Sequence, residues 1–158
     1  MEKLYKETGD ELLYWEAWDK NDRTGIVHWG KVGELGQSKE VASGIFSNFR
    51  KEMQKEFDQK VTEGYKEIDS ENLERLVIEY NIDGMGSESD LIKRHSLESR
   101  MNEFLGWRGL GHCDGGSIGS GTMEVICFVV NFNLAKNLIE EDLKDTELSD
   151  YSKIFKEE

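Results

Sequence analysis

The spacing of the apolar residues changes sharply within the first 70 residues, and this change constrains the fold more than any other feature of the chain. Between residues 12 and 32, apolar and polar residues alternate, which is typical of strands with one buried face. From Ile45 to Tyr65, large apolar residues recur every four positions, which predicts one amphipathic helix of about five turns. The two periods together predict a small antiparallel sheet with one long helix packed on it.

A short motif lies at the end of the predicted hairpin. The sequence reads Trp29-Gly30-Lys31-Val32-Gly33, continues with Gly36-Gln37, and reaches a helix that ends in Glu63-Gly64-Tyr65. This arrangement resembles the WGR domain over residues 2–68. WGR domains of poly(ADP-ribose) polymerases contact DNA ends, and others occur in bacterial proteins. The resemblance therefore implies that Trp29, Gly30 and Lys31 face nucleic acid.

The chain departs from the family motif at its third position. Lys31 stands where the family has arginine, and a lysine offers a mobile point charge instead of a planar fork of donors. The alternative interpretation is that Trp29 is a packing aromatic and that Gly30 and Gly33 serve the turn. Both interpretations stay open at this point.

The second half of the chain has the order strand, helix, short glycine-rich strand, strand, helix, strand. Ser87 and Asp90 have the spacing of a capping box at the start of the first helix. This order predicts a ferredoxin-like split βαβ sandwich, in which two helices pack on one face of a four-stranded sheet. The half resembles small bacterial proteins of this layout. We therefore expect an α+β protein with a WGR-like domain at 1–69 and an acidic ferredoxin-like domain at 70–158.

Residues 109–121 contain six glycines. A phosphate-binding loop needs a lysine and a following helix, and here no lysine is present and a strand follows. The glycines instead predict a hairpin that bends, bulges or passes close beneath a helix.

Charge is distributed unevenly in this chain, whose net charge is −13. Residues 1–68 have a net charge of −3 and residues 69–158 a net charge of −10, which disfavours binding to phosphate backbones at long range. An acidic cluster begins in the C-terminal part of the last predicted helix and consists of Glu140, Glu141, Asp142 and Asp145. Because such a cluster opposes the helix dipole, we expect it to steer a cationic partner.

These observations favour a non-enzymatic bacterial binding protein. The leading hypothesis is that its acidic surface engages a basic protein, as immunity proteins and nuclease inhibitors do. The alternative is a DNA- or RNA-binding module that acts through Trp29 and Lys31.

The sequence gives weaker support for a catalytic nucleophile or a metal site. His112, Cys113 and Asp114 invite a nucleophile or metal hypothesis, with His95 or Cys127 as further members, but no metal-ligand spacing is present. We expect no catalytic residue, metal or cofactor, and a buried thiol at Cys127. Two cysteines suit a reducing compartment, and no apolar run reaches the roughly 20 residues of a membrane span. We therefore expect a soluble cytoplasmic protein without membrane contact.

Overall fold

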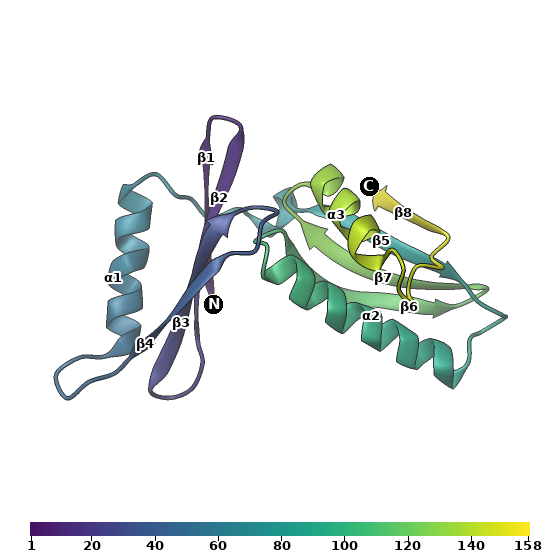
Figure 1. Ribbon diagram of the computed structural model, residues 1–158, viewed down its shortest axis with the longest axis horizontal. Coiled ribbons are helices and arrows are strands. Elements are labelled where there is room, and N and C mark those ends of the chain that lie inside the picture. Colours follow the sequence, from purple (N-terminus) through teal and green to yellow (C-terminus); the bar gives the residue numbers. More distant parts are fainter. The chain divides into compact units, whose positions relative to one another are not determined.

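A computed structural model describes residues 1–158, and the chain divides into two compact units, Met1–Asp69 and Ser70–Glu158 (Figure 1). Each unit contains one four-stranded antiparallel sheet. The expected α+β fold class is confirmed.

The first unit is a meander of four strands with one helix on one face. Its strands follow the chain in the order β1-β2-β3-β4 and are β1 (Glu2–Thr8), β2 (Glu11–Asp19), β3 (Thr24–Lys31) and β4 (Gln37–Ala42). The helix α1 (Phe49–Thr62) packs against the face that carries Trp15 and Val27. The buried core between them consists of Leu4, Trp15, Ala17, Val27, Phe49 and Met53.

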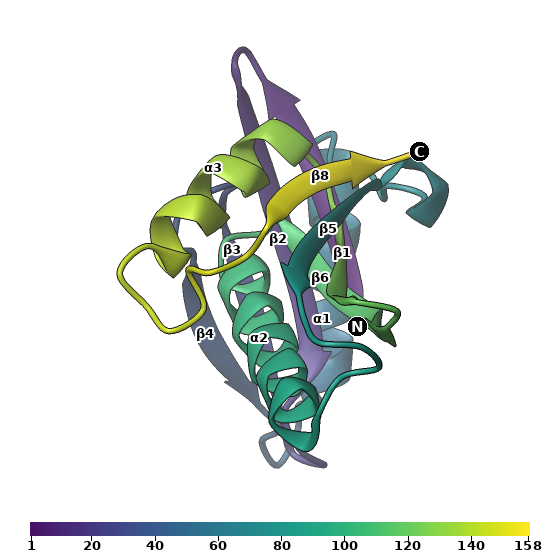
Figure 2. The same ribbon diagram turned by 90° about the vertical axis from the view of Figure 1, so that its right-hand side faces the viewer.

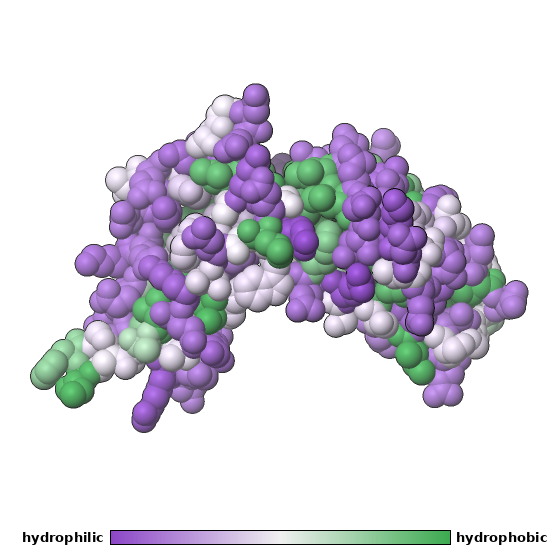
Figure 3. Space-filling view, in the orientation of Figure 1, coloured by the Kyte–Doolittle hydropathy of each residue, from purple (hydrophilic) through white to green (hydrophobic).

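The helix begins four residues later than the spacing of apolar residues predicts. Ile45 and Phe46 lie in the loop before α1 with exposed fractions of 94% and 101%, and hydrophobic atoms mark the tip of this loop (Figure 3). Asn48 caps the helix by accepting a hydrogen bond from the Arg50 amide, and neither Ser43 nor Ser47 does so. Those two serines instead accept the amides of Phe49 and Gly44, so side-chain hydrogen bonds hold the loop outside the helix.

The second unit has the strand order β6-β7-β5-β8, with β7 and β5 at its centre. After a 3-10 turn at Ser70–Asn72, its elements are β5 (Glu74–Asn81), α2 (Glu88–Gly106), β6 (Gly111–Gly119), β7 (Thr122–Val129), α3 (Phe132–Leu143) and β8 (Lys153–Glu157). Both helices lie on the same face of the sheet (Figure 2). This is the expected split βαβ arrangement.

Local signals account for most element boundaries in this unit. The capping box is present, because Ser87 accepts from the Asp90 amide and the Asp90 side chain accepts from the Ser87 amide. The cap of α3 is Asn131, whose side chain accepts a hydrogen bond from the Leu134 amide. β7 is a central strand, and its buried residues alternate from Met123 to Val129 on the side that faces the helices.

The glycine-rich segment forms β6 and its turns, as predicted. A bulge interrupts the pairing with β7 between Cys113 and Gly116. A Cβ atom on Gly116 would collide with the carbonyl oxygen of Glu124 and with the Arg94 side chain of α2. Gly111 has a φ of 149°, and a Cβ atom there would collide with the Phe128 carbonyl oxygen. The glycines therefore let β6 pass close to both β7 and α2.

We predict that Gly111→Ala lowers the free energy of unfolding by about 1–3 kcal/mol. The new methyl group would collide with backbone atoms, which cannot move aside as a side chain does when it changes its rotamer. Gly106→Ala is the matched control, since that residue ends α2 with no atom within 4 Å of an added Cβ. Urea unfolding of the full chain measures both. Equal stability of the two variants would contradict the tight strand contact.

Candidate functional site

The Trp-Gly-Lys motif occupies the end of β3. Trp29 lies directly opposite Trp15 of β2 and is half-buried against the core of the first unit. Because Lys31 follows two positions later on the same strand, both side chains belong to the sheet face that α1 covers. Trp29 is therefore a half-buried packing aromatic, and that it also faces nucleic acid stays a prediction.

Two glycines close the turn behind the motif. A Cβ atom on Gly30 would lie 3.1 Å from the Cα atom of Gly36. A Cβ atom on Gly36 would collide with the Tyr14 hydroxyl and with His28. The segment from β3 to β4 thus folds back tightly on the strand, which fixes the position of the motif.

Lys31 stays charged in an acidic setting. Its Nζ atom lies 3.2 Å from Glu11 Oε1 and 3.5 Å from Glu34 Oε1, and its side chain is 41% exposed. The hydrogen bond to Glu11, with the negative charges of Glu11 and Glu34, raises the pKa of Lys31. An anion that approaches Lys31 competes with these two carboxylates.

A second lysine lies on the same sheet face. Lys6 of β1 and Lys31 of β3 both face Leu13 of β2 across the strand pairs, so the three side chains form one row. Lys6 donates a hydrogen bond of 2.7 Å to the Glu63 carbonyl oxygen at the end of α1.

Tyr65 brings a third lysine into this region. The Nζ atoms of Lys6 and Lys60 lie 5.7 and 5.1 Å from the centroid of the Tyr65 ring, which is cation–π geometry. Lys60 also pairs with Glu63 and lowers the pKa of that carboxyl group. We call Lys6, Trp29, Lys31, Lys60 and Tyr65 the basic-aromatic edge.

The basic-aromatic edge includes residues that sequence reasoning missed. Lys6, Lys60 and Tyr65 were not among the predicted site residues, although Tyr65 was placed at the end of the helix. The turn signal Thr8-Gly9-Asp10 in the sequence could have placed Lys6, because pairing Thr8 with Glu11 brings Lys6 opposite Leu13. An open depression of about 390 Å³ also borders Lys6, with Leu12, Gly64 and Lys66 among its lining residues.

The opposite face of this sheet carries a buried polar chain. The Tyr14 hydroxyl lies 3.0 Å from His28 Nε2, and His28 Nδ1 lies 2.6 Å from Glu16 Oε1. Lys3 Nζ approaches the second oxygen of Glu16 at 3.5 Å. Because Glu16 and His28 are direct cross-strand neighbours, this chain joins β2 to β3 from the side away from the motif.

The four predicted acidic residues have different surroundings. Asp142 accepts from Arg100 Nε at 2.8 Å and from its Nη2 at 3.2 Å, so it joins α3 to α2, and this hydrogen bonding raises the pKa of Arg100. Asp142 therefore contributes to the fold, contrary to the expectation that the cluster does not. Glu140 pairs with Lys136 at 3.2 Å. Glu140, Glu141 and Asp145 line one open depression of about 520 Å³. That they engage a basic protein stays a prediction.

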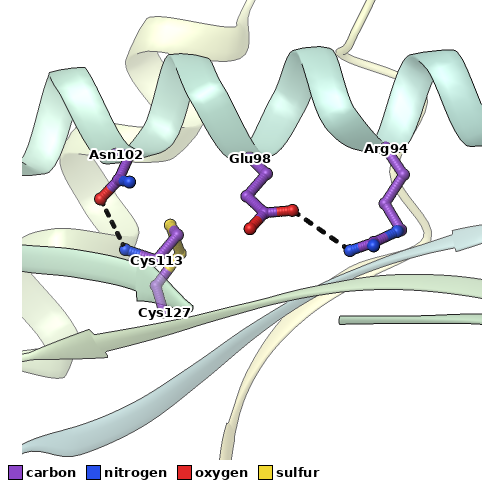
Figure 4. Close-up of a disulfide and its surroundings, with 5 residues drawn as sticks. All are labelled: Arg94, Glu98, Asn102, Cys113 and Cys127. Atoms are coloured by element: carbon purple, nitrogen blue, oxygen red, sulfur yellow. Dashed lines mark hydrogen bonds and ion pairs between the residues drawn. A yellow bond between two sulfur atoms is a disulfide. The ribbon is translucent and has the colours of Figure 1, made fainter. Parts of the chain in front are cut away.

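The cysteines form a disulfide, which corrects two expectations. Cys113 of β6 and Cys127 of β7 are opposite each other in register and are bonded (Figure 4). Cys127 is thus no free core thiol, and Cys113 has no free thiol to act as a nucleophile with His95, His112 or Asp114. The backbone amide of Cys113 donates to the Asn102 side chain on α2 (Figure 4). No group of three or more metal-ligating side chains is present.

Comparison with known proteins identifies one domain. Residues 13–72 match the family model of the WGR domain, which confirms the resemblance seen in the sequence for most of the first unit. No curated protein and no solved structure matches the chain. No helix is long and apolar enough to cross a membrane.

The disulfide predicts that the unreduced folded protein has no thiol that reacts with a thiol reagent, and that reduction followed by unfolding releases two. A thiol titration before and after reduction measures this directly. Cys113→Ser, which leaves Cys127 unpaired, is the control that should give one thiol upon unfolding without a reductant. Two reactive thiols in the unreduced protein would contradict the disulfide.

Proposed function

We propose that the WGR domain of this chain binds nucleic acid through the basic-aromatic edge. The observation that carries the proposal is the row formed by Lys6, Leu13 and Lys31 on the sheet face that also holds Trp29. The family adds support, since WGR domains of poly(ADP-ribose) polymerases contact DNA ends. The chain then acts as a binding protein, without a catalytic step of its own.

The two kinds of side chain in the edge have separate roles in this proposal. Lys6, Lys31 and Lys60 contact phosphates, which gives affinity without sequence information. The exposed parts of Trp29 and Tyr65 pack against a sugar or a base at a strand end, where the rings of the last base pair are accessible. Stacking of this kind tolerates any base.

The acidic neighbours set the strength of the interaction. Lys31 must exchange Glu11 and Glu34 for a phosphate, and a lysine cannot form the two-pronged contact of an arginine. The net charge of −13 also slows approach to a polyanion. The proposal therefore predicts modest affinity that falls steeply as salt concentration rises.

The test is fluorescence anisotropy with a short labelled DNA duplex over a range of salt concentrations. We predict that Lys31→Ala and Lys6→Ala each weaken binding and reduce the slope of log K against log salt by about 1. Lys51→Ala is the matched control, because it removes the same charge from an exposed residue in the first turn of α1. Equal losses in all three variants would indicate a general charge effect and contradict the proposed site.

The same anisotropy assay can also detect a variant that binds DNA more tightly. Glu34→Gln removes one of the two carboxylates that compete for Lys31 and should tighten binding, since the phosphate then displaces only Glu11. Glu52→Gln, an exposed acidic residue in the first turn of α1, gives the same charge change away from the edge. If Glu52→Gln tightens binding as much as Glu34→Gln does, Lys31 is not the contact.

A further inference from the structure

The second sheet has one face without a helix. α2 and α3 cover the face with the buried side chains of β5 and β7 (Figure 2), and no element of the second unit covers the other. Alternation along the strands gives this helix-free face its residues, which are Arg75, Val77 and Glu79 on β5, Glu124, Ile126 and Phe128 on β7, and Lys153, Phe155 and Glu157 on β8.

The middle of the helix-free face is apolar. Val77 lies directly between Ile126 and Phe155 and is only 1% exposed. Phe128 stacks on His112 of β6, with ring centroids 5.6 Å apart. A solvated face of an antiparallel sheet normally carries polar side chains. This apolar strip, in which Ile126, Phe128 and Phe155 are half-buried around the fully buried Val77, is instead typical of a surface that another molecule covers.

Two carboxylates face each other beside this strip. Glu79 and Glu124 are direct cross-strand neighbours on the central strands, and like charges in this position repel. Glu79 accepts a hydrogen bond of 3.1 Å from the Ser152 hydroxyl and lies 3.7 Å from Lys153 Nζ, whereas Glu124 accepts a hydrogen bond of 3.1 Å from the neutral Ser117 hydroxyl. A cationic side chain from outside would relieve this repulsion.

The charges on the helix-free face and on the whole second unit indicate which class of partner this face would bind. Arg75 is already paired with Glu157 at 2.8 Å, so the cations of the face are committed to its own carboxylates. Residues 69–158 have a net charge of −10, which repels a phosphate backbone and also a second copy of this unit. A segment with apolar and basic side chains on one side complements both the strip and the carboxylates.

We propose that the helix-free face docks a basic amphipathic segment of a partner protein. Its apolar side chains lie on the half-buried Ile126, Phe128 and Phe155, and a lysine or arginine lies between Glu79 and Glu124. The proposal does not depend on nucleic-acid binding by the first unit, because it concerns a different sheet and a ligand of opposite charge.

The test uses the full chain and a labelled synthetic helical peptide that places leucines on one side and lysines beside them. Anisotropy measures its binding against a scrambled peptide of the same composition. Tighter binding of the amphipathic peptide, at least several-fold, is expected. Equal binding of both peptides would overturn the proposal, because it would show attraction by net charge alone.

Protein variants locate the contact. Glu124→Gln and Ile126→Thr should each weaken binding several-fold, whereas Glu103→Gln, an exposed acidic residue of α2 on the helix side, should leave it nearly unchanged. Circular dichroism confirms that each variant is folded. Equal effects of Glu124→Gln and Glu103→Gln would overturn the proposal.

Amide shifts in NMR spectra of the labelled full chain give a readout that does not depend on variants. Shifts upon peptide addition should concentrate in β5, β7 and β8. Shifts confined to α3 and the acidic depression near Glu141 would overturn the proposal and place a cationic ligand there instead. Self-association of the chain that blocks these strands, seen by sedimentation, would also overturn it, since a second copy would then be the occupant.

Discussion

The packing of α1 on one face of the first sheet is the constraint on which the proposed interface depends. Trp15, Phe49 and Met53 meet in this core, and they determine which side of every strand faces the helix. Because side chains alternate along a strand, a slip of one residue in β3 would move Trp29 and Lys31 to the other face. The hydrophobic core thus determines where the motif points, although Lys31 itself contributes little to that core.

The opposite face holds the register in place. Glu16 pairs with His28 and Tyr14 with Gly30 across β2 and β3, and the hydrogen bonds of Tyr14, His28 and Glu16 link these positions. A buried polar chain of this kind stabilises one register over its neighbours, because a shifted pairing would leave buried donors and acceptors without partners. The small size of Gly30 and Gly36 allows the turn to close over this chain. Two chemically different faces therefore specify the same arrangement of the motif.

Much of the fold follows from local patterns in the sequence, whereas the composition of the site does not. Alternation, helical spacing and the Ser87–Asp90 capping box predict the element order and the split βαβ layout, because each signal acts within a few residues. The start of α1 was predicted too early, since Ile45 continues the spacing of four but Asn48 and two serines hold the loop outside the helix. The disulfide depends on cross-strand register, which the bulge in β6 obscures. The lysine row has the same origin, because Lys6 and Lys31 are 25 residues apart and meet only through the pairing of three strands.

The two units differ in charge, because lysines and aromatic rings gather at the basic-aromatic edge of the first, whereas residues 69–158 have a net charge of −10 against −3 for residues 1–68. The central claim is that the WGR domain contacts nucleic acid through the basic-aromatic edge, beside the C-terminal end of α1. The most direct measurement is a two-dimensional NMR titration of the labelled full chain with a short DNA duplex at low salt. The account predicts shifts at the amides of Lys6, Lys31 and Tyr65 and at the Trp29 indole. Shifts centred on another surface of the first unit, or on the second unit, would contradict it.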